Sequence, residues 1–151
     1  MDPATISDAA VRQSAGVIPK IIAVEPIPVT VSGTQDFAIS EGRTRVHTSV
    51  ILRLVTEDEN VTGIAEIVCA PPGKPEELPD EIMGAVRTIV APALIGLAAT
   101  DRALGSARVE AALKGRAWTK AAVNVALHDL QARALGVSVI DLLGGQINNE
   151  I

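Results

Sequence analysis

The chain has 151 residues, of which 48% are hydrophobic and 21% are charged, and its formal net charge is −5. This length and apolar content suit one domain with its own core, and they exclude a chain that is disordered throughout. The acidic balance, with no basic run and no aromatic platform, makes nucleic acid an unexpected partner, and no apolar run is long enough to span a bilayer. Cys69 is the single cysteine, so no internal disulfide can form; with no secretory signal visible, we expect a cytoplasmic protein.

The first predicted strand covers residues 20–31 and follows a stretch, 1–19, that has no hydrophobic period and is expected to be a mobile leader. Pro26 and Pro28 remove two N–H groups from the same side of this strand, which a sheet tolerates only at an open edge. The strand is therefore predicted at the edge of its sheet. Its expected apolar face contains Ile21, Ala23, Ile27, Val29 and Val31.

Two further strands are predicted, after a connection at residues 32–45 that has the composition of a long loop. Loops of this length inside compact domains are usually either functional or disordered. Residues 46–57 and 61–69 alternate as strands and meet at a short charged turn, which predicts an antiparallel hairpin. With the first strand they form a three-stranded antiparallel meander. The expected core face of the second strand contains Val46, Thr48, Val50, Leu52 and Leu54.

The hydrophobic period becomes helical after the proline-rich stretch 70–75. One helix is predicted from about Leu78 to Pro92, where proline should stop it. A second helix is predicted from a cap at Thr100 or Asp101 to about Leu113.

The last predicted helix has the clearest pattern of the chain. Thr119 is expected to cap its start, and Gly136 to end it in the left-handed conformation. Asp129 and Arg133 are four residues apart and are expected to pair. One buried stripe is predicted, made of Val123, Leu127, Leu130 and Ala134. Three strands followed by about three helices predict an α+β fold with the helices packed on one face of the sheet.

Several short motifs, in this order, resemble the N-terminal capping domain of the mandelate racemase and muconate lactonizing branch of the enolase superfamily. The last helix carries Ala-Leu-x-Asp-Leu at 126–130 and leads into Leu-Leu-Gly-Gly at 142–145. Residues 91–96 read Ala-Pro-x-Leu-Ile-Gly, and residues 63–66 read Gly-Ile-Ala-Glu where the family often has Gly-x-Gly-Glu. The resemblance implies a capping domain at 20–145, with 146–151 beginning a linker to a C-terminal barrel that this chain lacks.

The resemblance also implies a chemistry, the Mg²⁺-dependent abstraction of a proton next to a carboxylate by a racemase, epimerase, cycloisomerase or acid-sugar dehydratase. In that family the metal ligands and the base lie on the barrel strands, so no catalytic residue and no metal ligand is assigned here. By itself the chain is expected to be inactive and to bind no Mg²⁺.

The capping domain of the family covers the barrel mouth, so the resemblance implies contact with a carboxylate-bearing small molecule. Phe37 and Ile39 would supply an apolar wall, and Arg43 or Arg45 would meet an anionic substituent. Cys69 and Ala70 would lie at the edge of the pocket. From the residues alone, Phe37 equally suits a loop anchor, the arginines a solvated surface, and Cys69 a small buried apolar position.

Two other hypotheses remain open from the sequence. The first is a non-enzymatic α+β module that associates with itself or with a partner, because a cap without its barrel exposes apolar surface. The second is an unrelated α+β domain, which a parallel sheet or helices interleaved between the strands would favour.

Overall fold

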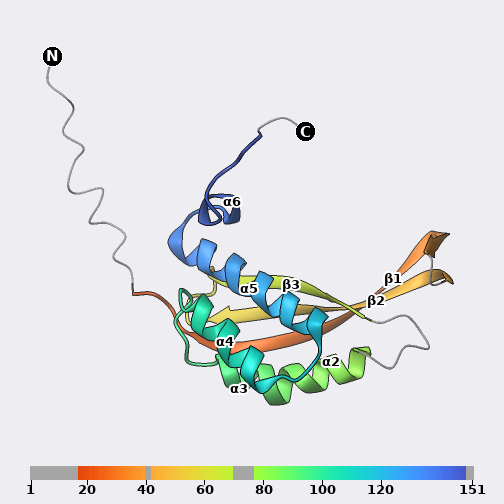
Figure 1. Cartoon of the computed structure of the whole chain (residues 1–151), viewed down its shortest axis with the longest axis horizontal. Coiled ribbons are helices and arrows are strands. Elements are labelled where there is room, and N and C mark those ends of the chain that lie inside the picture. The colour runs from red at the N-terminus through yellow and green to blue at the C-terminus, as the bar shows by residue number, and fades with distance from the viewer. Residues whose placement is uncertain (1–16, 40–41, 70–76, 149–151) are drawn as a thin grey trace, which may run out of the picture.

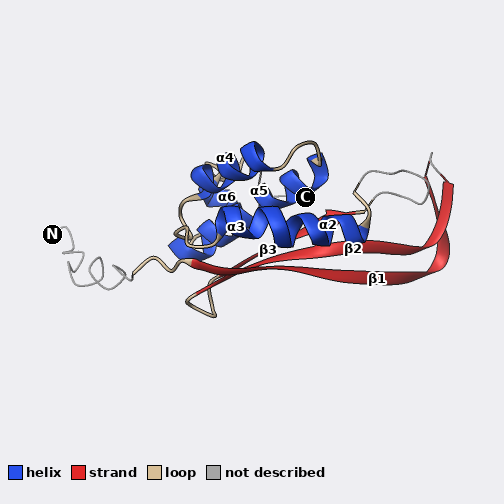
Figure 2. Cartoon of the chain, turned by 90° about the horizontal axis from the view of Figure 1, so that it is seen from below, coloured by secondary structure: helices blue, strands red, loops and turns tan. Residues whose placement is uncertain are grey.

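The computed structural model describes the backbone of residues 17–39, 42–69 and 77–148, and the side chains of all of these except 34–39 and 42–45. Residues 1–16 of the predicted leader and 149–151 of the predicted linker lie outside these ranges. Helices cover one face of a three-stranded sheet (Figures 1 and 2). The elements in chain order are β1 (Ile21–Ile39), β2 (Gly42–Thr56), β3 (Thr62–Val68), α2 (Pro79–Ala85), the π-helical η1 (Val86–Val90), α3 (Ala91–Leu94), α4 (Arg102–Ala112), α5 (Ala117–Leu135) and α6 (Val139–Leu142).

The sheet has the order β1-β2-β3, and both pairs of neighbours are antiparallel. This confirms the predicted meander and α+β fold, and it places β1 at an edge, as the two prolines of that strand require. The turn between β2 and β3 is closed by Thr56, whose hydroxyl donates to the carbonyls of Asp58 and Val61.

The predicted apolar face of β1 is wrong, because the register shifts between Ile21 and Ala23. This irregularity puts Ile21 and Val24 in the core, although they are three residues apart. Beyond the shift, Val24 pairs with buried Leu54 and faces the helices. Every second residue from Glu25 onward therefore faces away from the helices. The exposed side chains on that outward side include Ile27, Val29 and Val31.

The loop predicted at residues 32–45 is also wrong. β1 continues to Ile39 and β2 begins at Gly42, so the two strands form a long ribbon with a register shift between Ser32 and Phe37. The ribbon extends past the helices and bends toward their side of the sheet (Figure 2). Cross-strand hydrogen bonding, rather than apolar alternation, makes this segment extended, which explains why the hydrophobic pattern misses it.

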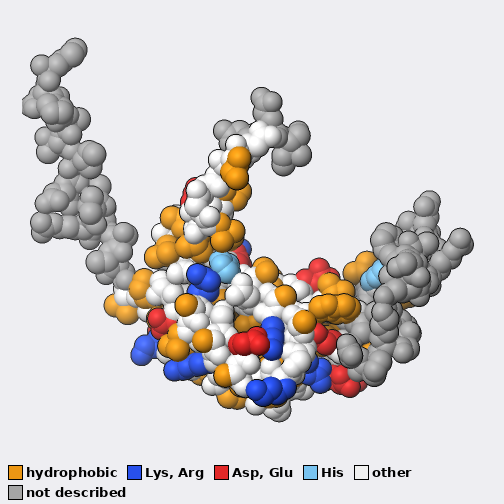
Figure 3. Space-filling model, viewed as in Figure 1, with side chains coloured by type: hydrophobic (Ala, Val, Ile, Leu, Met, Phe, Trp, Pro, Cys, Tyr) orange, Lys and Arg blue, Asp and Glu red, His pale blue; other side chains and the backbone are white. Residues whose placement is uncertain are grey.

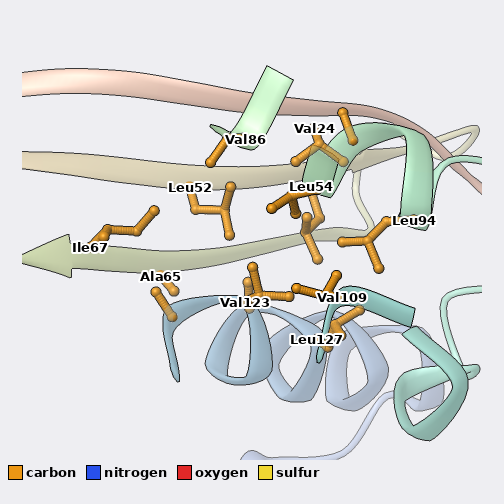
Figure 4. Packing of buried hydrophobic residues seen from close by; sticks show 14 of the residues in the cluster. Val24, Leu52, Leu54, Ala65, Ile67, Val86, Leu94, Val109, Val123 and Leu127 are labelled. Carbon is orange, nitrogen blue, oxygen red and sulfur yellow. The ribbon is translucent and has the colours of Figure 1, made fainter. Parts of the chain in front are cut away.

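The core lies between the inner face of the sheet and the helices. The predicted core face of β2 is confirmed at Val50, Leu52 and Leu54, which are fully buried, but is wrong at Val46, which is 52% exposed. Ile67 joins the core from β3. Leu52, Leu54 and Ile67 belong to one buried cluster with Val109 of α4 and with Val123 and Leu127 of α5 (Figure 4). The predicted stripe of α5 is confirmed, with Val123, Leu127 and Leu130 buried and Ala134 packed at its border.

The helical path continues through Pro92, so the predicted stop at this residue is wrong. α2 runs into the π-helical turn η1 and then into α3, in which Pro92 lies in the first turn. The N–H of Ala91 donates to the carbonyl of Val86, five residues earlier. Such a wide turn absorbs the loss of an N–H and the crowding that proline causes in a regular helix.

The starts of α4 and α5 differ in how well the sequence predicted them. Asp101 is the N-cap residue of α4, one of the two predicted, although its side chain accepts from the N–H of Ala98 at 3.2 Å rather than from the helix. The predicted cap of α5 is wrong: its N-cap residue is Arg116, and Thr119 is buried inside the first turn. Gly136 ends α5 at φ 67°, as predicted. Among the described residues, no helix combines the length and the apolar character that crossing a bilayer needs.

Candidate functional site

The candidate site lies at one end of the sheet. β1 and β3 both run antiparallel to β2, so the turn after β1 and the exit from β3 are at the same end. α2 begins at this end too (Figure 1). The topology therefore places the two segments that the family resemblance associates with the substrate at the same end of the sheet.

Four of the predicted contact residues lie on the ribbon rather than in a loop. In the backbone pairing, Phe37 lies opposite Thr44, Ala38 opposite Arg43, and Ile39 opposite Gly42. The two predicted apolar residues therefore flank the residue that pairs with Arg43. Arg45 belongs to the same part of β2. Backbone pairing thus brings Phe37, Ile39, Arg43 and Arg45 together at the far end of the ribbon.

Cys69 follows β3 directly and lies apart from the ribbon end. Val68, the neighbour of Cys69, pairs with Ser49, and Arg43 lies six residues before Ser49 on β2. At about 3.3 Å per residue, Ser49 and Arg43 are roughly 20 Å apart along the strand. Cys69 is half-buried and free. Ala70, the other residue predicted at the pocket edge, lies outside the described residues.

The environment of Cys69 keeps its thiol protonated. Burial raises the pKa of Cys69 above its ordinary value, and the negative charges of Glu77 and Glu66 raise it further. A thiol in such surroundings is a poor nucleophile, because only the thiolate attacks. Cys69 therefore suits the role of a small apolar contact at the site, not of a reactive group.

Glu77 lies just before α2, and no pattern in the sequence indicates its role. Its side chain is only 6% exposed. Its carboxylate accepts hydrogen bonds from the backbone N–H groups of Trp118 and Thr119, both at 2.8 Å, and from the Thr119 hydroxyl at 2.6 Å. We call this set of bonds the Glu77 clamp. A negative charge at the N-terminus of α5 is favoured by the helix dipole and by the free N–H groups there.

Within the described ranges, no group of three or more His, Cys, Asp or Glu side chains is placed to hold a metal ion. The described residues therefore do not offer the cluster of carboxylates that a magnesium site needs. What the arrangement offers is a ribbon end whose sequence contains apolar and cationic residues, a half-buried protonated thiol and the Glu77 clamp. Such a set can bind and orient a ligand and exclude water.

Residues 21–144 match the family described as "Mandelate racemase / muconate lactonizing enzyme, N-terminal domain". The chain belongs to this family. Its α+β fold and the motifs around Asp129 agree with that assignment. The match covers β1 through α6 and so includes both segments of the candidate site.

Relatives of this N-terminal domain include two bacterial enzymes. Muconate cycloisomerase 1-2 of Acinetobacter lwoffii is 32% identical over 133 residues, which are 87% of this chain and 34% of that protein. A chloromuconate cycloisomerase of Cupriavidus pinatubonensis is 34% identical over 132 residues, which are 87% of this chain and 35% of that protein. The chain thus spans about a third of the length of these relatives.

A solved structure shows the same architecture. The muconate lactonizing enzyme of Pseudomonas fluorescens, complexed with muconolactone, superposes with a TM-score of 0.79 and is 28% identical. The shared region covers 88% of this chain and 36% of that one. The three-stranded sheet followed by helices is therefore the architecture of an N-terminal domain in this family.

Proposed function

We propose that this chain is the substrate-binding N-terminal domain of a Mg²⁺-dependent cycloisomerase that acts on a muconate-like carboxylate substrate. The observation that carries the proposal is its identity of 32% and 34% to two cycloisomerases, each over 87% of the chain. Catalysis needs the C-terminal barrel of such an enzyme, where the bound metal would stabilise the negative charge that develops next to the carboxylate.

The contribution of this domain is to hold the substrate and to keep water away from the reacting carbon. In the proposed enzyme, Arg43 and Arg45 on the ribbon pair with a substrate carboxylate that is remote from the reaction. Phe37 and Ile39 cover the apolar carbon chain, and Cys69 lines the opposite edge as a protonated, neutral contact. Interactions of this kind place the reacting atoms and raise the effective concentration of the substrate at the barrel.

A domain exchange tests the proposal. Residues 21–144 replace the matching segment of the Acinetobacter lwoffii muconate cycloisomerase, and turnover of muconate is measured with and without Mg²⁺. We expect the chimera to be active only with the metal and the 151-residue chain alone to be inactive. Arg43→Gln and Arg45→Gln should each raise KM, whereas Arg87→Gln, an exposed arginine of η1, should leave it unchanged. A folded chimera without activity contradicts the proposal, as does activity of the chain alone.

Self-association is the second candidate function, and an exposed apolar patch favours it. Hydrophobic side chains gather where α5 runs into α6 (Figure 3). This α6 patch consists of Leu135, Val137, Ile140 and Leu143, which are 43–69% exposed. Contiguous apolar surface of this kind commonly marks a contact surface.

Light scattering on the 151-residue chain tests this second candidate. We expect a dimer or larger species that becomes a monomer in Leu143→Lys. Leu104→Lys, which changes an exposed leucine on α4, serves as the matched control and should not alter the mass. A monomer at all concentrations contradicts self-association.

A further inference from the structure

β3 presents one edge of its backbone to the outside of the sheet. The N–H of Ile64 points away from β2, because it donates to the Asp129 carboxylate. In an antiparallel strand every second residue repeats this direction, so the N–H and carbonyl groups of Glu66 and Val68 also point outward. Both residues are exposed, and within the described ranges no group accepts a hydrogen bond from either N–H. We call the backbone of residues 66–68 the open edge.

The opposite edge of the sheet, on β1, lacks such donors at its prolines. Pro26 and Pro28 pair with Leu52 and Val50, the residues at which β2 bonds to β3 instead. The ring nitrogens therefore occupy outward positions of β1, where a further strand would need an N–H. Extended peptides that add to a sheet pair with an edge that keeps its donors and acceptors. Of these two stretches, the open edge of β3 is the one that can accept a further strand.

α5 forms a wall beside the open edge. It lies along β3, with its start toward the end of that strand (Figure 1). Asp129 reaches the edge, and Val125 and Ala121 precede it by four and eight residues, on the same side of the helix. Both are exposed, Val125 at 56%. A segment paired with the open edge would therefore also lie against small apolar side chains of α5.

A second copy of the chain does not fit the open edge with its own β3. The hydrogen bonds of a symmetric pair of edges require antiparallel strands, which keeps both α5 helices on one face of the sheet. α5 packs directly on β3, since a Cβ added at Gly63 would lie 2.8 Å from the Cβ of Leu130. Paired strands are about 4.8 Å apart, whereas packed helices need about 8–10 Å between their axes. The open edge therefore suits an extended segment that has no helix packed over it.

The side chains around the open edge indicate the composition of this segment. Glu66 projects from the outer face of the sheet, where its carboxylate accepts from the Ser49 hydroxyl. Arg53, on the same face of β2, is occupied by Glu25 at 2.6 Å. A basic side chain directly opposite Glu66 would complement its charge. The neighbours of that basic residue point to the other face, toward Val125, where small apolar side chains fit.

We propose that the open edge and the adjoining side of α5 bind an extended peptide segment of a partner protein, which carries a basic residue opposite Glu66 and small apolar residues facing Val125. The segment adds a fourth strand to the sheet. Hydrogen bonds to the backbone of Glu66 and Val68 supply the affinity, and the two kinds of side-chain contact supply the selectivity. The residues of this site are not those proposed to contact the substrate, so peptide binding does not depend on the proposed function.

Amide NMR of the 151-residue chain, titrated with the peptide acetyl-Thr-Val-Lys-Val-Thr-amide, tests the proposal. We expect the amides of Glu66, Val68 and Val125 to shift with one common Kd. At saturation the amides of Glu66 and Val68 should exchange with solvent at least about tenfold more slowly, because they gain acceptors. The matched probe is the same peptide with a methyl group on the lysine backbone nitrogen, which removes the N–H that would pair with Glu66. It should bind at least about fivefold more weakly.

Two variants of the chain change the site itself. Val68→Pro removes one outward N–H and leaves the bonds between β2 and β3 in place, so it should weaken binding of the lysine peptide at least about fivefold. Glu66→Lys should also weaken this binding, and it should favour the peptide with glutamate in place of lysine. Glu110→Lys makes the same change of charge on an exposed residue of α4 and should leave both affinities unchanged. Thermal unfolding shows whether each variant folds; if Val68→Pro does not, Glu66→Lys and the methylated peptide still decide.

Several outcomes would overturn the proposal. The first is the absence of binding at millimolar peptide, and the second is equal binding of the plain and the methylated peptide. Shifts confined to residues other than those of the open edge and the adjoining side of α5 are a third. Light scattering supplies the last: a dimer that Val68→Pro abolishes would show that a second copy of the chain, rather than a peptide segment, occupies the edge.

Discussion

The carboxylate of Asp129 on α5 accepts a hydrogen bond from the backbone N–H of Ile64 on β3, at 2.9 Å. β3 is an edge strand, and this bond satisfies an N–H that no neighbouring strand can reach. The other carboxylate oxygen accepts from Arg133 at 3.1 Å, the pair that the sequence predicted. The family motif around Asp129 and the Gly63-Ile64 segment are therefore two sides of one contact.

Gly63 allows this contact because α5 crosses the strand at its position. A Cβ added at Gly63 would collide with the carbonyl oxygen of Ala126 and lie 2.8 Å from the Cβ of Leu130. Since backbone atoms cannot move aside cheaply, we expect Gly63→Ala to lower the free energy of unfolding by about 3 kcal/mol. Urea unfolding followed by circular dichroism measures it.

Gly84→Ala is the matched control for that substitution. Gly84 lies inside α2, and a Cβ there meets nothing within 4 Å. Alanine should stabilise the helix by about 0.5–1 kcal/mol. Equal effects of the two substitutions would show that α5 does not press on β3 at Gly63.

Removal of the Asp129 side chain should uncover the edge of β3. We expect Asp129→Ala to cost about 1–2 kcal/mol, because the N–H of Ile64 loses its acceptor. Arg133→Ala should cost less than about 0.5 kcal/mol, since an exposed pair on one helix contributes little. Asp129→Asn retains an acceptor oxygen and should recover most of the loss. Chemical denaturation decides, and an Arg133→Ala effect as large as that of Asp129→Ala would contradict the edge role.

The acid–base behaviour of Cys69 should follow its surroundings. Burial is the main cause that raises its pKa, followed by the charges of Glu77 and Glu66, so Glu66→Gln should lower the pKa of Cys69 part of the way toward its ordinary value. Glu66 accepts from the Ser49 hydroxyl on the sheet surface, and its replacement leaves the core intact. The rate of thiol labelling as a function of pH gives the pKa. An unchanged profile in Glu66→Gln would contradict the electrostatic contribution.

The same raised pKa of Cys69 gives a direction to the dependence of stability on pH. The folded state binds the thiol proton more tightly than the unfolded chain does. The stabilisation is therefore complete below the unfolded-state pKa and is lost as the pH rises through the folded-state pKa. Cys69→Ala should flatten the decrease of stability at alkaline pH, as measured by urea unfolding at several pH values. If the stability of Cys69→Ala falls with rising pH as steeply as that of the parent chain, groups other than Cys69 cause the loss.

Substitutions of leucine should destabilise the protein at buried positions and have little effect at exposed ones. Leu52 is fully buried on β2, and we expect Leu52→Ala to cost about 3 kcal/mol, from lost apolar burial and the cavity left behind. Leu104, by contrast, is 47% exposed on α4. Leu104→Ala should change stability by less than about 1 kcal/mol. Thermal and urea unfolding compare the two, and a large effect at Leu104 would contradict the observed orientation of α4.

The sequence by itself determined the features that follow from short-range physics. The alternation of apolar residues predicted that Val50, Leu52 and Leu54 lie in the core. Helical spacing predicted the same for Val123, Leu127 and Leu130. Gly136 was predicted to end α5 because glycine adopts positive φ at little cost. The order of three strands followed by helices indicated the α+β fold, and the short motifs indicated the family.

Only the tertiary structure decided how distant segments support one another. The pairing of Phe37 with Thr44 turned an expected loop into a ribbon, and the wide turn before Pro92 let the helix continue. Thr119 became a donor to Glu77 instead of a cap. These outcomes depend on hydrogen bonds and packing between residues far apart in the chain, whose free energy no local pattern contains, whereas periodicity and turn chemistry act within a few residues and can be read directly.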